Sequence, residues 1–162
     1  MLGGDLRSIG VMDKLIPNIK TQSDFDALFE YLHSDDRLLV MRAADAVEKI
    51  TIKHPEFLQN HKRGVIEFFE TAEDKEFKWH LAQLVPRLPL SAKELKMVWN
   101  KLTVWATDKK GSKIVRVNSI QTLFDLSENY RYLKKDFLSV VQTVEKENVP
   151  SINARIGKLK TK

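Results

Sequence analysis

Apolar residues recur at intervals of three and four positions along nearly the whole chain, which is the spacing that places them on one face of an α-helix. The segment 23–36 illustrates this pattern with Phe25, Leu28, Phe29 and Leu32. Strict alternation of apolar and polar residues, which is typical of a half-buried strand, is not the prevailing pattern. The pattern therefore predicts an all-α fold.

The helical pattern repeats, because three stretches superpose without internal gaps at spacings of 38 and 36 residues. They are VMRAADAVEKI (40–50), KWHLAQLVPRL (78–88) and IVRVNSIQTLF (114–124). Their third positions hold Arg42, His80 and Arg116, and their fourth, seventh and last positions are apolar. A shorter copy, NARIGKL (153–159), has Arg155 39 residues after Arg116.

A second amphipathic helix is predicted after each of these three stretches, at 55–70, 91–106 and 130–145. The repeating unit is therefore helix, turn, helix. Helices at about 11–20 and 24–33 form a leading pair, and 151–160 forms a last helix without a partner. One domain, 1–162, is expected. It comprises a flexible leader (1–10), the leading pair (11–34), three repeats (35–72, 73–108 and 109–147) and a terminal helix with a basic tail (148–162).

Residues at the expected helix starts have the chemistry of N-terminal caps. Ser23 followed by Asp26, and Ser91 followed by Glu94, have the three-residue spacing of a capping box. Pro55 stands at a natural first position of the helix 55–70.

Two prolines interrupt the middle repeat, in the stretch KWHLAQLVPRLPL. Pro86 removes an amide donor and crowds the carbonyl of Ala82, so we expect a local kink there, and we expect Pro89 to end the helix. His80 has no second histidine at the spacing of a zinc-binding helix. Because it occupies the arginine position of the repeat, we expect it to reach a carbonyl or carboxylate of a neighbouring repeat.

The helix pairs resemble the HEAT repeat over residues 23 to about 160. The features that carry the resemblance are the arginine or histidine position, acidic residues in the turns, and Pro86 in the second half of a first helix. The segments LGGDLRSIG, RAADAVEKITIKHPEFL and WHLAQLVPRLPL are similar to small bacterial and archaeal HEAT-repeat proteins of no established activity. The resemblance implies a right-handed α-α superhelix, a HEAT-like solenoid of about four hairpins plus a terminal helix. It also implies a scaffold role, with the second helices lining the concave face.

Composition excludes several kinds of chemistry. The chain has no cysteine, which excludes disulfides, thiolate metal sites and thiol nucleophiles. No signal peptide or membrane span is evident, and we expect a cytoplasmic protein. The leader GGDLRSIG lacks the Gly-Lys-Ser/Thr of a phosphate-binding loop. It is expected to dock on the first repeat or, alternatively, to act as a partner-binding arm.

The formal charge of +5 is unevenly placed. Residues 1–108 carry 15 Lys and Arg against 17 Asp and Glu, whereas residues 109–162 carry 12 against 5. A basic C-terminal third could meet an acidic partner, nucleic acid or an anionic surface. Solvated helix faces and a Lys-rich tail that keep the protein in solution are the preferred interpretation.

Tryptophans offer a second kind of candidate, a base-stacking platform or an aromatic cage. Trp99 stands at helical spacing between Leu95 and Leu102, which predicts a core position. For Trp79 and Trp105, packing is the preferred interpretation.

The candidate site is a row of polar residues on the second helices. When these helices are registered on Leu58, Leu95 and Leu133, Gln59, Lys96 and Lys134 take equivalent solvent-facing positions. Further polar residues lie close by: Arg63, Asn100 and Lys135. This row is the predicted partner-binding set, although a charge row on a helix is usually only a solvated face.

Two functions of different classes are consistent with these features. The first is a non-catalytic HEAT-repeat scaffold or adaptor that binds a protein, or an acidic segment of one, along its second helices. We expect no cofactor or metal and no catalytic activity, because no nucleophile and base stand in a recognisable arrangement. The alternative is nucleic-acid binding, since some HEAT-like solenoids are alkylpurine DNA glycosylases. Trp105 and Asp108 are the nearest aromatic and carboxylate pair for that chemistry.

Overall fold

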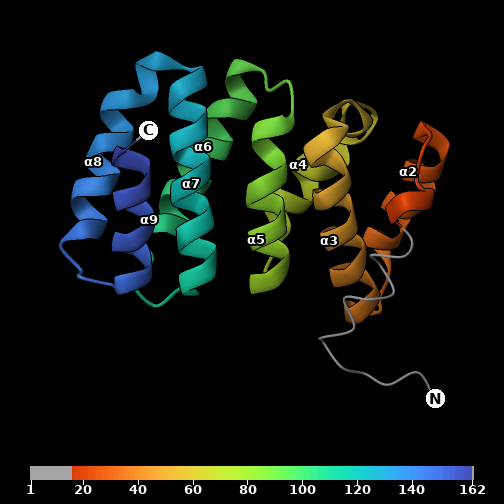
Figure 1. Ribbon diagram of the computed structural model, residues 1–162, viewed down its shortest axis with the longest axis horizontal. Helices are drawn as coiled ribbons and strands as arrows, with labels where there is room; N and C mark the ends of the chain where they lie inside the picture. The colour runs from red at the N-terminus through yellow and green to blue at the C-terminus, as the bar shows by residue number, and fades with distance from the viewer. Residues whose placement is uncertain (1–15, 162) are drawn as a thin grey trace. The chain divides into compact units, whose positions relative to one another are not determined.

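The computed structural model describes residues 16–161 (Figure 1). Within this range the chain forms α-helices and short 3-10 helices, and no β-strand occurs there, which confirms the all-α prediction. The leader GGDLRSIG and the start of the helix expected at 11–20 lie outside the described residues. The chain divides into two compact units between Arg63 and Gly64.

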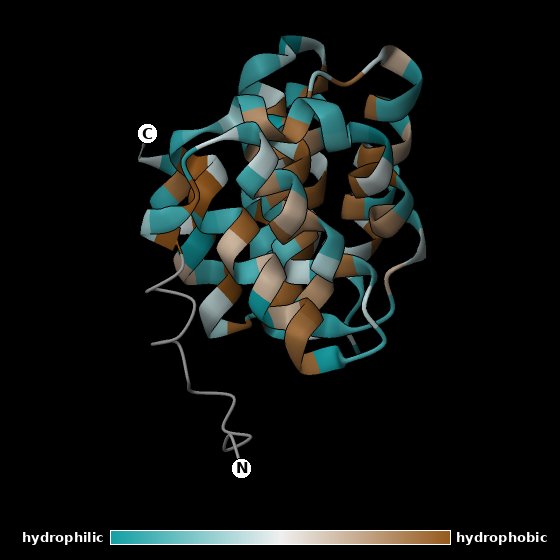
Figure 2. Ribbon diagram, turned by 90° about the vertical axis from the view of Figure 1, so that its right-hand side faces the viewer, coloured by the Kyte–Doolittle hydropathy of each residue, from teal (hydrophilic) through white to brown (hydrophobic). Residues whose placement is uncertain are grey.

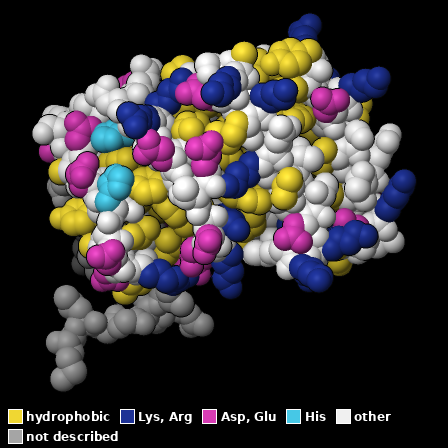
Figure 3. All heavy atoms as spheres, turned by 180° about the vertical axis from the view of Figure 1, so that it is seen from behind, with side chains coloured by type: hydrophobic (Ala, Val, Ile, Leu, Met, Phe, Trp, Pro, Cys, Tyr) yellow, Lys and Arg dark blue, Asp and Glu magenta, His cyan; other side chains and the backbone are white. Residues whose placement is uncertain are grey.

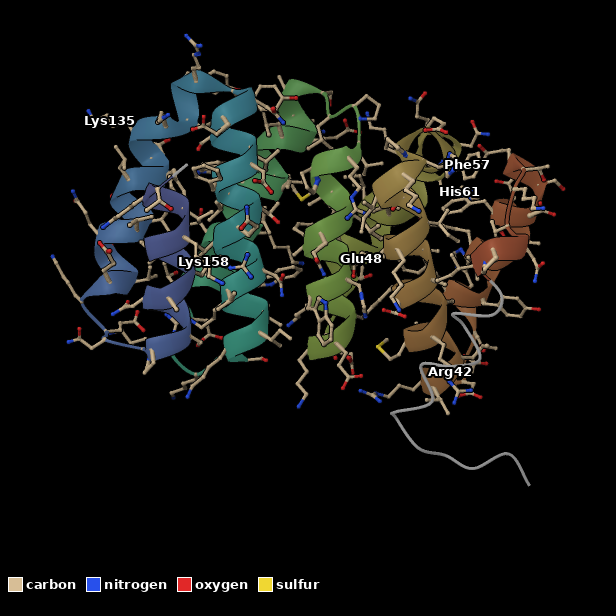
Figure 4. All side chains as sticks on the ribbon, in the orientation of Figure 1. Arg42, Glu48, Phe57, His61, Lys135 and Lys158 are labelled. Carbon is tan, nitrogen blue, oxygen red and sulfur yellow. The ribbon has the colours of Figure 1, made fainter. Side chains whose placement is uncertain are left out.

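The first unit is built around one long helix, α3, which packs against α2 and three 3-10 segments. Its elements are η1 (Ile16–Asn18), α2 (Gln22–Glu30), η2 (Tyr31–His33), α3 (Arg37–Lys53) and η3 (Pro55–His61). His61 stacks on Phe29 with ring centroids 4.0 Å apart and lies beside α2 (Figure 4). Its Nε2 is 2.6 Å from an oxygen of Asp26, so an aromatic stack and a polar contact together join η3 to α2.

The second unit contains six α-helices. They are α4 (Lys62–Thr71), which starts just before the unit boundary, α5 (Lys75–Leu84), α6 (Ala92–Thr107), α7 (Lys113–Asn129), α8 (Lys134–Glu145) and α9 (Pro150–Lys160). Two 3-10 segments, η4 (Val85–Arg87) and η5 (Arg131–Leu133), extend α5 and precede α8. Helix α7 packs between α5 and α9 and also contacts α6 and α8 (Figure 1).

Each helix buries one face, as the spacing of apolar residues predicts. Along every ribbon, hydrophobic stretches alternate with hydrophilic ones (Figure 2). At the seventh position of the repeated stretches, Ala46, Leu84 and Ile120 are at most 1 % exposed. Trp99, expected in the core, is also buried.

The arginine position of the repeat joins helices in the second unit. Arg116 is 2 % exposed, and its Nε donates to the Ala106 carbonyl at 2.9 Å. Its Nη2 donates to Glu147 Oε2 at 2.7 Å. In α9, Arg155 donates to the side-chain oxygen of Gln121 in α7 at 2.9 Å. Arg116 and Arg155 therefore each reach a neighbouring element. His80, at the same position of the repeat, is buried and stacks on Trp79, the residue before it in α5.

Contrary to expectation, the α-helix does not continue through a kink at Pro86 to Pro89 but ends before Pro86. The α-helix ends at Leu84, the next turn is the 3-10 helix η4, and Leu88 is extended. The Ala82 carbonyl, which cannot receive a hydrogen bond from the proline nitrogen, instead accepts one from Thr122 Oγ1 at 2.7 Å. A hydroxyl on α7 thus satisfies a buried acceptor that the proline leaves open on α5.

The two predicted capping boxes can be compared directly with the structure. The capping box of Ser91 and Glu94 is present at the start of α6. The box predicted at Ser23 and Asp26 is wrong, because Thr21 and Asp24 form it two residues earlier. The two pairs have the same spacing, so spacing alone does not choose between them, and Asp26 instead accepts a hydrogen bond from Gln22.

The second helices of the repeats begin less regularly than expected. The helix predicted at 55–70 is a 3-10 helix over 55–61 followed by α4, and Pro55 is its first residue. The helix predicted at 130–145 likewise begins with η5 before α8. The helix predicted at 91–106 agrees with α6.

Candidate partner-binding site

The predicted register of the second helices is correct. Leu58, Leu95 and Leu133 are buried. The polar residues registered on them are all exposed to solvent, as predicted: Gln59, Arg63, Lys96, Asn100, Lys134 and Lys135. The period of the helix was sufficient to identify these positions as solvent-facing.

Lys96 and Asn100 line a shallow groove of about 640 Å³ between α6 and the end of α4. We call it the α6 groove. Its lining residues are Glu70 on α4 and Lys93, Lys96, Met97, Asn100, Lys101, Val104 and Trp105 on α6. The α6 residues recur at intervals of three and four, so a single helix face forms most of the groove.

The polar groups at the start of the α6 groove have no internal partner. The Nζ atoms of Lys93 and Lys96 form no ion pair with any residue of the described range, and the Asn100 side chain forms no hydrogen bond there. All three side chains are exposed. Two positive charges and an amide are therefore available to a ligand that enters the groove.

Lys101 stands further along the groove in a more confined position. Its Nζ donates to the backbone carbonyl of Glu70 and lies 5.8 Å from the centroid of the Trp105 ring. Lys78 approaches the same ring at 5.7 Å. Burial and the neighbouring Lys78 charge lower the pKa of Lys101 below its ordinary value, and the nearby Glu70 opposes this shift. Lys101 is thus bound to α4 through the Glu70 carbonyl, unlike Lys93 and Lys96.

Trp105 lines the α6 groove and packs against Phe69 of α4. It is 8 % exposed, and its ring centroid lies 4.7 Å from that of Phe69. Packing is therefore its role in the structure. Asp108, the carboxylate nearest in sequence, follows the last residue of α6 and accepts a hydrogen bond from the Lys110 amide at 3.0 Å.

The other predicted site residues do not line the α6 groove. Lys134 borders a second hollow of about 450 Å³ between α7, α8 and α9, which we call the end pocket. Lys135 projects away from the start of α8 (Figure 4). Arg63 is the last residue of the first unit and is exposed. The predicted set is thus not one site.

The end pocket is mainly apolar. Its lining residues are Phe124, Glu128, Lys134, Phe137, Leu138, Val141, Ile156, Leu159 and Lys160. Both of its lysines are paired with carboxylates: Lys134 with Glu128 at 2.8 Å and Lys160 with Glu145 at 2.5 Å.

Sequence reasoning did not identify Lys93, Lys101 or Val104 as site residues. Lys93 and Lys96 are three residues apart and therefore share a face with Asn100, so the helical period could have added Lys93 to the set. The contact of Lys101 with Glu70 joins positions 31 residues apart, and it becomes evident only when α4 packs beside α6.

Metal-binding and membrane-spanning features were also sought in the structure. Within residues 16–161, no group of three or more His, Cys, Asp or Glu side chains is placed to hold a metal ion. In the same part of the chain, no helix is both long and apolar enough to cross a bilayer. No protein-family model, no curated protein and no solved structure matches the chain.

Proposed function

We propose that this protein is a non-catalytic, HEAT-like adaptor that binds an acidic segment of a protein partner in the α6 groove, on the face of its second helices α4 and α6. The observation that carries the proposal is the α6 groove, in which Lys93, Lys96 and Asn100 have no partner among the described residues. An acidic segment supplies the carboxylates that these groups lack.

The helix order supports the HEAT-like part of the proposal. First helices α5, α7 and α9 pack side by side, and each of α5 and α7 is followed by a second helix. The repeated arginine position links adjacent elements through Arg116 and Arg155. A stack of similar helix pairs in which each contacts its neighbours is the arrangement of a solenoid, and solenoids commonly bind partners along an extended face.

The electrostatics favour recognition rather than a stabilising role for these lysines. Exposed lysines without a carboxylate partner contribute little to the stability of a fold. In a groove, however, they attract an acidic ligand and fix its register, and this attraction weakens as salt is added.

Nucleic-acid binding is less well supported. The Trp105 ring is buried against Phe69 and does not offer an open face on which a base could stack. On the side of Figure 3 where α6 and α8 lie, Lys and Arg side chains are interspersed with acidic and hydrophobic ones. A channel for a phosphate backbone is expected to be more uniformly positive.

The experiment is a selection from a random peptide display library on the purified protein, followed by titration of the selected peptides. We expect acidic peptides to be enriched and their affinity to fall at least about tenfold in the double variant Lys93→Glu, Lys96→Glu. The matched control, Lys135→Glu with Lys158→Glu, makes the same change of charge outside the groove and should leave affinity unchanged.

Two results would overturn the proposal. One is the absence of acidic enrichment, or enrichment that the groove variant does not affect. The other is that a single-stranded DNA oligonucleotide binds more tightly than any selected peptide and loses affinity steeply with salt in a groove-dependent manner, which would assign the site to nucleic acid.

A further inference from the structure

The α6 groove changes character along its length. Its polar, unpaired residues, Lys93 and Lys96, stand in the first turns of α6. Its apolar lining comes later, from Met97 and Val104, and Val104 is 63 % exposed. An exposed valine at the rim of a groove with a buried tryptophan beneath it is an apolar contact surface.

The α4 wall reinforces this difference. Glu70 faces the later part of α6, where its backbone carbonyl holds Lys101. Glu70 itself lines the groove, and its side-chain charge partly offsets the lowering of the Lys101 pKa. A second carboxylate brought to this end would be repelled by Glu70, whereas at the other end Lys93 and Lys96 have no carboxylate partner among the described residues.

We infer that the α6 groove recognises a short peptide segment with two ends: an acidic side chain bound by Lys93 and Lys96, and an apolar side chain placed on Val104. This inference rests on the proposed function and adds to it the pattern and direction of the bound segment. Charge complementarity identifies the acidic end, and the exposed valine identifies the apolar end.

The length of the segment follows from helix geometry. Lys96 and Val104 are eight residues apart on α6, which is about 12 Å at about 1.5 Å per residue. An extended ligand spans this distance in about four residues, and a helical ligand spans it in about eight. Affinity should therefore depend on the separation between the acidic and apolar residues of the ligand.

The test uses synthetic peptides that contain a Glu-Glu pair and one Leu, in a neutral Gly-Ser-Ala background, with the separation varied from none to ten residues. Binding to the full-length protein is measured by calorimetry or fluorescence anisotropy. We expect a maximum of affinity at a separation of about four or about eight residues, several-fold above the remaining separations. A flat dependence on separation would overturn the inference.

Protein variants test each end separately. Val104→Asn, which adds polarity without charge, should weaken the best peptide several-fold and should not weaken the same peptide with Leu replaced by Ala. The control Leu138→Asn makes the same kind of change at another exposed apolar residue, in the end pocket, and should have no effect. Circular dichroism and thermal melting establish that each variant is folded.

The possible failures can be told apart. If Glu-Glu peptides bind through Lys93 and Lys96 but neither the spacing nor Val104→Asn matters, the inference is wrong and the proposed function stands. If no acidic peptide binds, or binding is the same in the Lys93→Glu, Lys96→Glu variant, both are wrong.

Discussion

The two hollows of the second unit differ in the state of their lysines. In the α6 groove, Lys93 and Lys96 have no carboxylate partner within the described residues. In the end pocket, Lys134 and Lys160 are each paired with a glutamate. Lysines thus line both hollows, but of these lysines Lys93 and Lys96 in the α6 groove are the ones available to bind an anion.

This difference shows that net charge is a poor guide to available charge. The α6 groove lies wholly before residue 109, in the part of the chain where acidic residues outnumber basic ones. The basic C-terminal third contributes lysines to the end pocket, but glutamates neutralise them there. It also contributes Arg116, but the charge of this residue is paired with Glu147 in a buried ion pair.

The largest expected effect concerns stability. Glu147→Ala leaves the buried charge of Arg116 without its partner, and we expect it to lower the free energy of unfolding by about 3–5 kcal/mol. Lys96→Ala, which removes an unpaired exposed charge, should change it by less than about 0.5 kcal/mol. Urea denaturation of both variants measures the contrast, and equal losses would show that pairing does not distinguish the two kinds of cation.

The next effect concerns binding. With an acidic peptide obtained from the display selection, Lys93→Ala with Lys96→Ala should reduce affinity about five- to tenfold, because two charge-assisted contacts are lost. Lys134→Ala with Lys160→Ala removes the same charge from the paired lysines and should reduce affinity less than about twofold. Isothermal titration calorimetry measures the affinity of both double variants for the peptide. A larger loss in the Lys134→Ala, Lys160→Ala variant would show that the end pocket, and not the α6 groove, binds the peptide.

A third experiment attempts to make the end pocket resemble the α6 groove. Glu128→Gln with Glu145→Gln removes the carboxylates that neutralise Lys134 and Lys160. We expect a second, weaker site for acidic peptides to appear, with an affinity several-fold below that of the groove. NMR shift changes at residues of α8 and α9 on titration would detect it. Their absence would mean that free lysines beside an apolar hollow are insufficient.

The smallest effect is a dependence on pH. Because burial and Lys78 lower the pKa of Lys101, the folded protein releases this proton at a lower pH than the unfolded chain, whose lysine titrates near 10.5. The unfolded state therefore binds more protons just below pH 10.5, and stability relative to Lys101→Met should rise slightly as the pH approaches 10.5 from below. Denaturation at several pH values measures this, and a fall over the same range would contradict the lowered pKa.

Local features of the fold were predictable from the sequence, and contacts between distant residues were not. Ser91 and Glu94 form their capping box because only neighbouring backbone is involved. The exposure of Lys96 and Asn100 follows from the helical period. By contrast, the pairing of Lys160 with Glu145 depends on how α9 lies against α8, which no local rule provides.

For the candidate site, too, the sequence predicted which residues are exposed but not which partners they have. Its two members on α6 were identified because they share one helix face. Lys134 was included with them because it occupies an equivalent repeat position, yet Glu128 pairs with it and places it in a different chemical setting. Equivalence in a repeat defines where a side chain points, whereas its partners depend on residues that the repeat does not specify.

The contact between Thr122 and the Ala82 carbonyl has a consequence for sequence variation. A chain that keeps Pro86 but loses the hydroxyl at 122 would bury an acceptor without a donor, at a cost of about 1–3 kcal/mol. A chain that replaces the proline regains a backbone donor for that carbonyl and no longer requires the hydroxyl. Positions 86 and 122, although 36 residues apart, should therefore change together in related sequences.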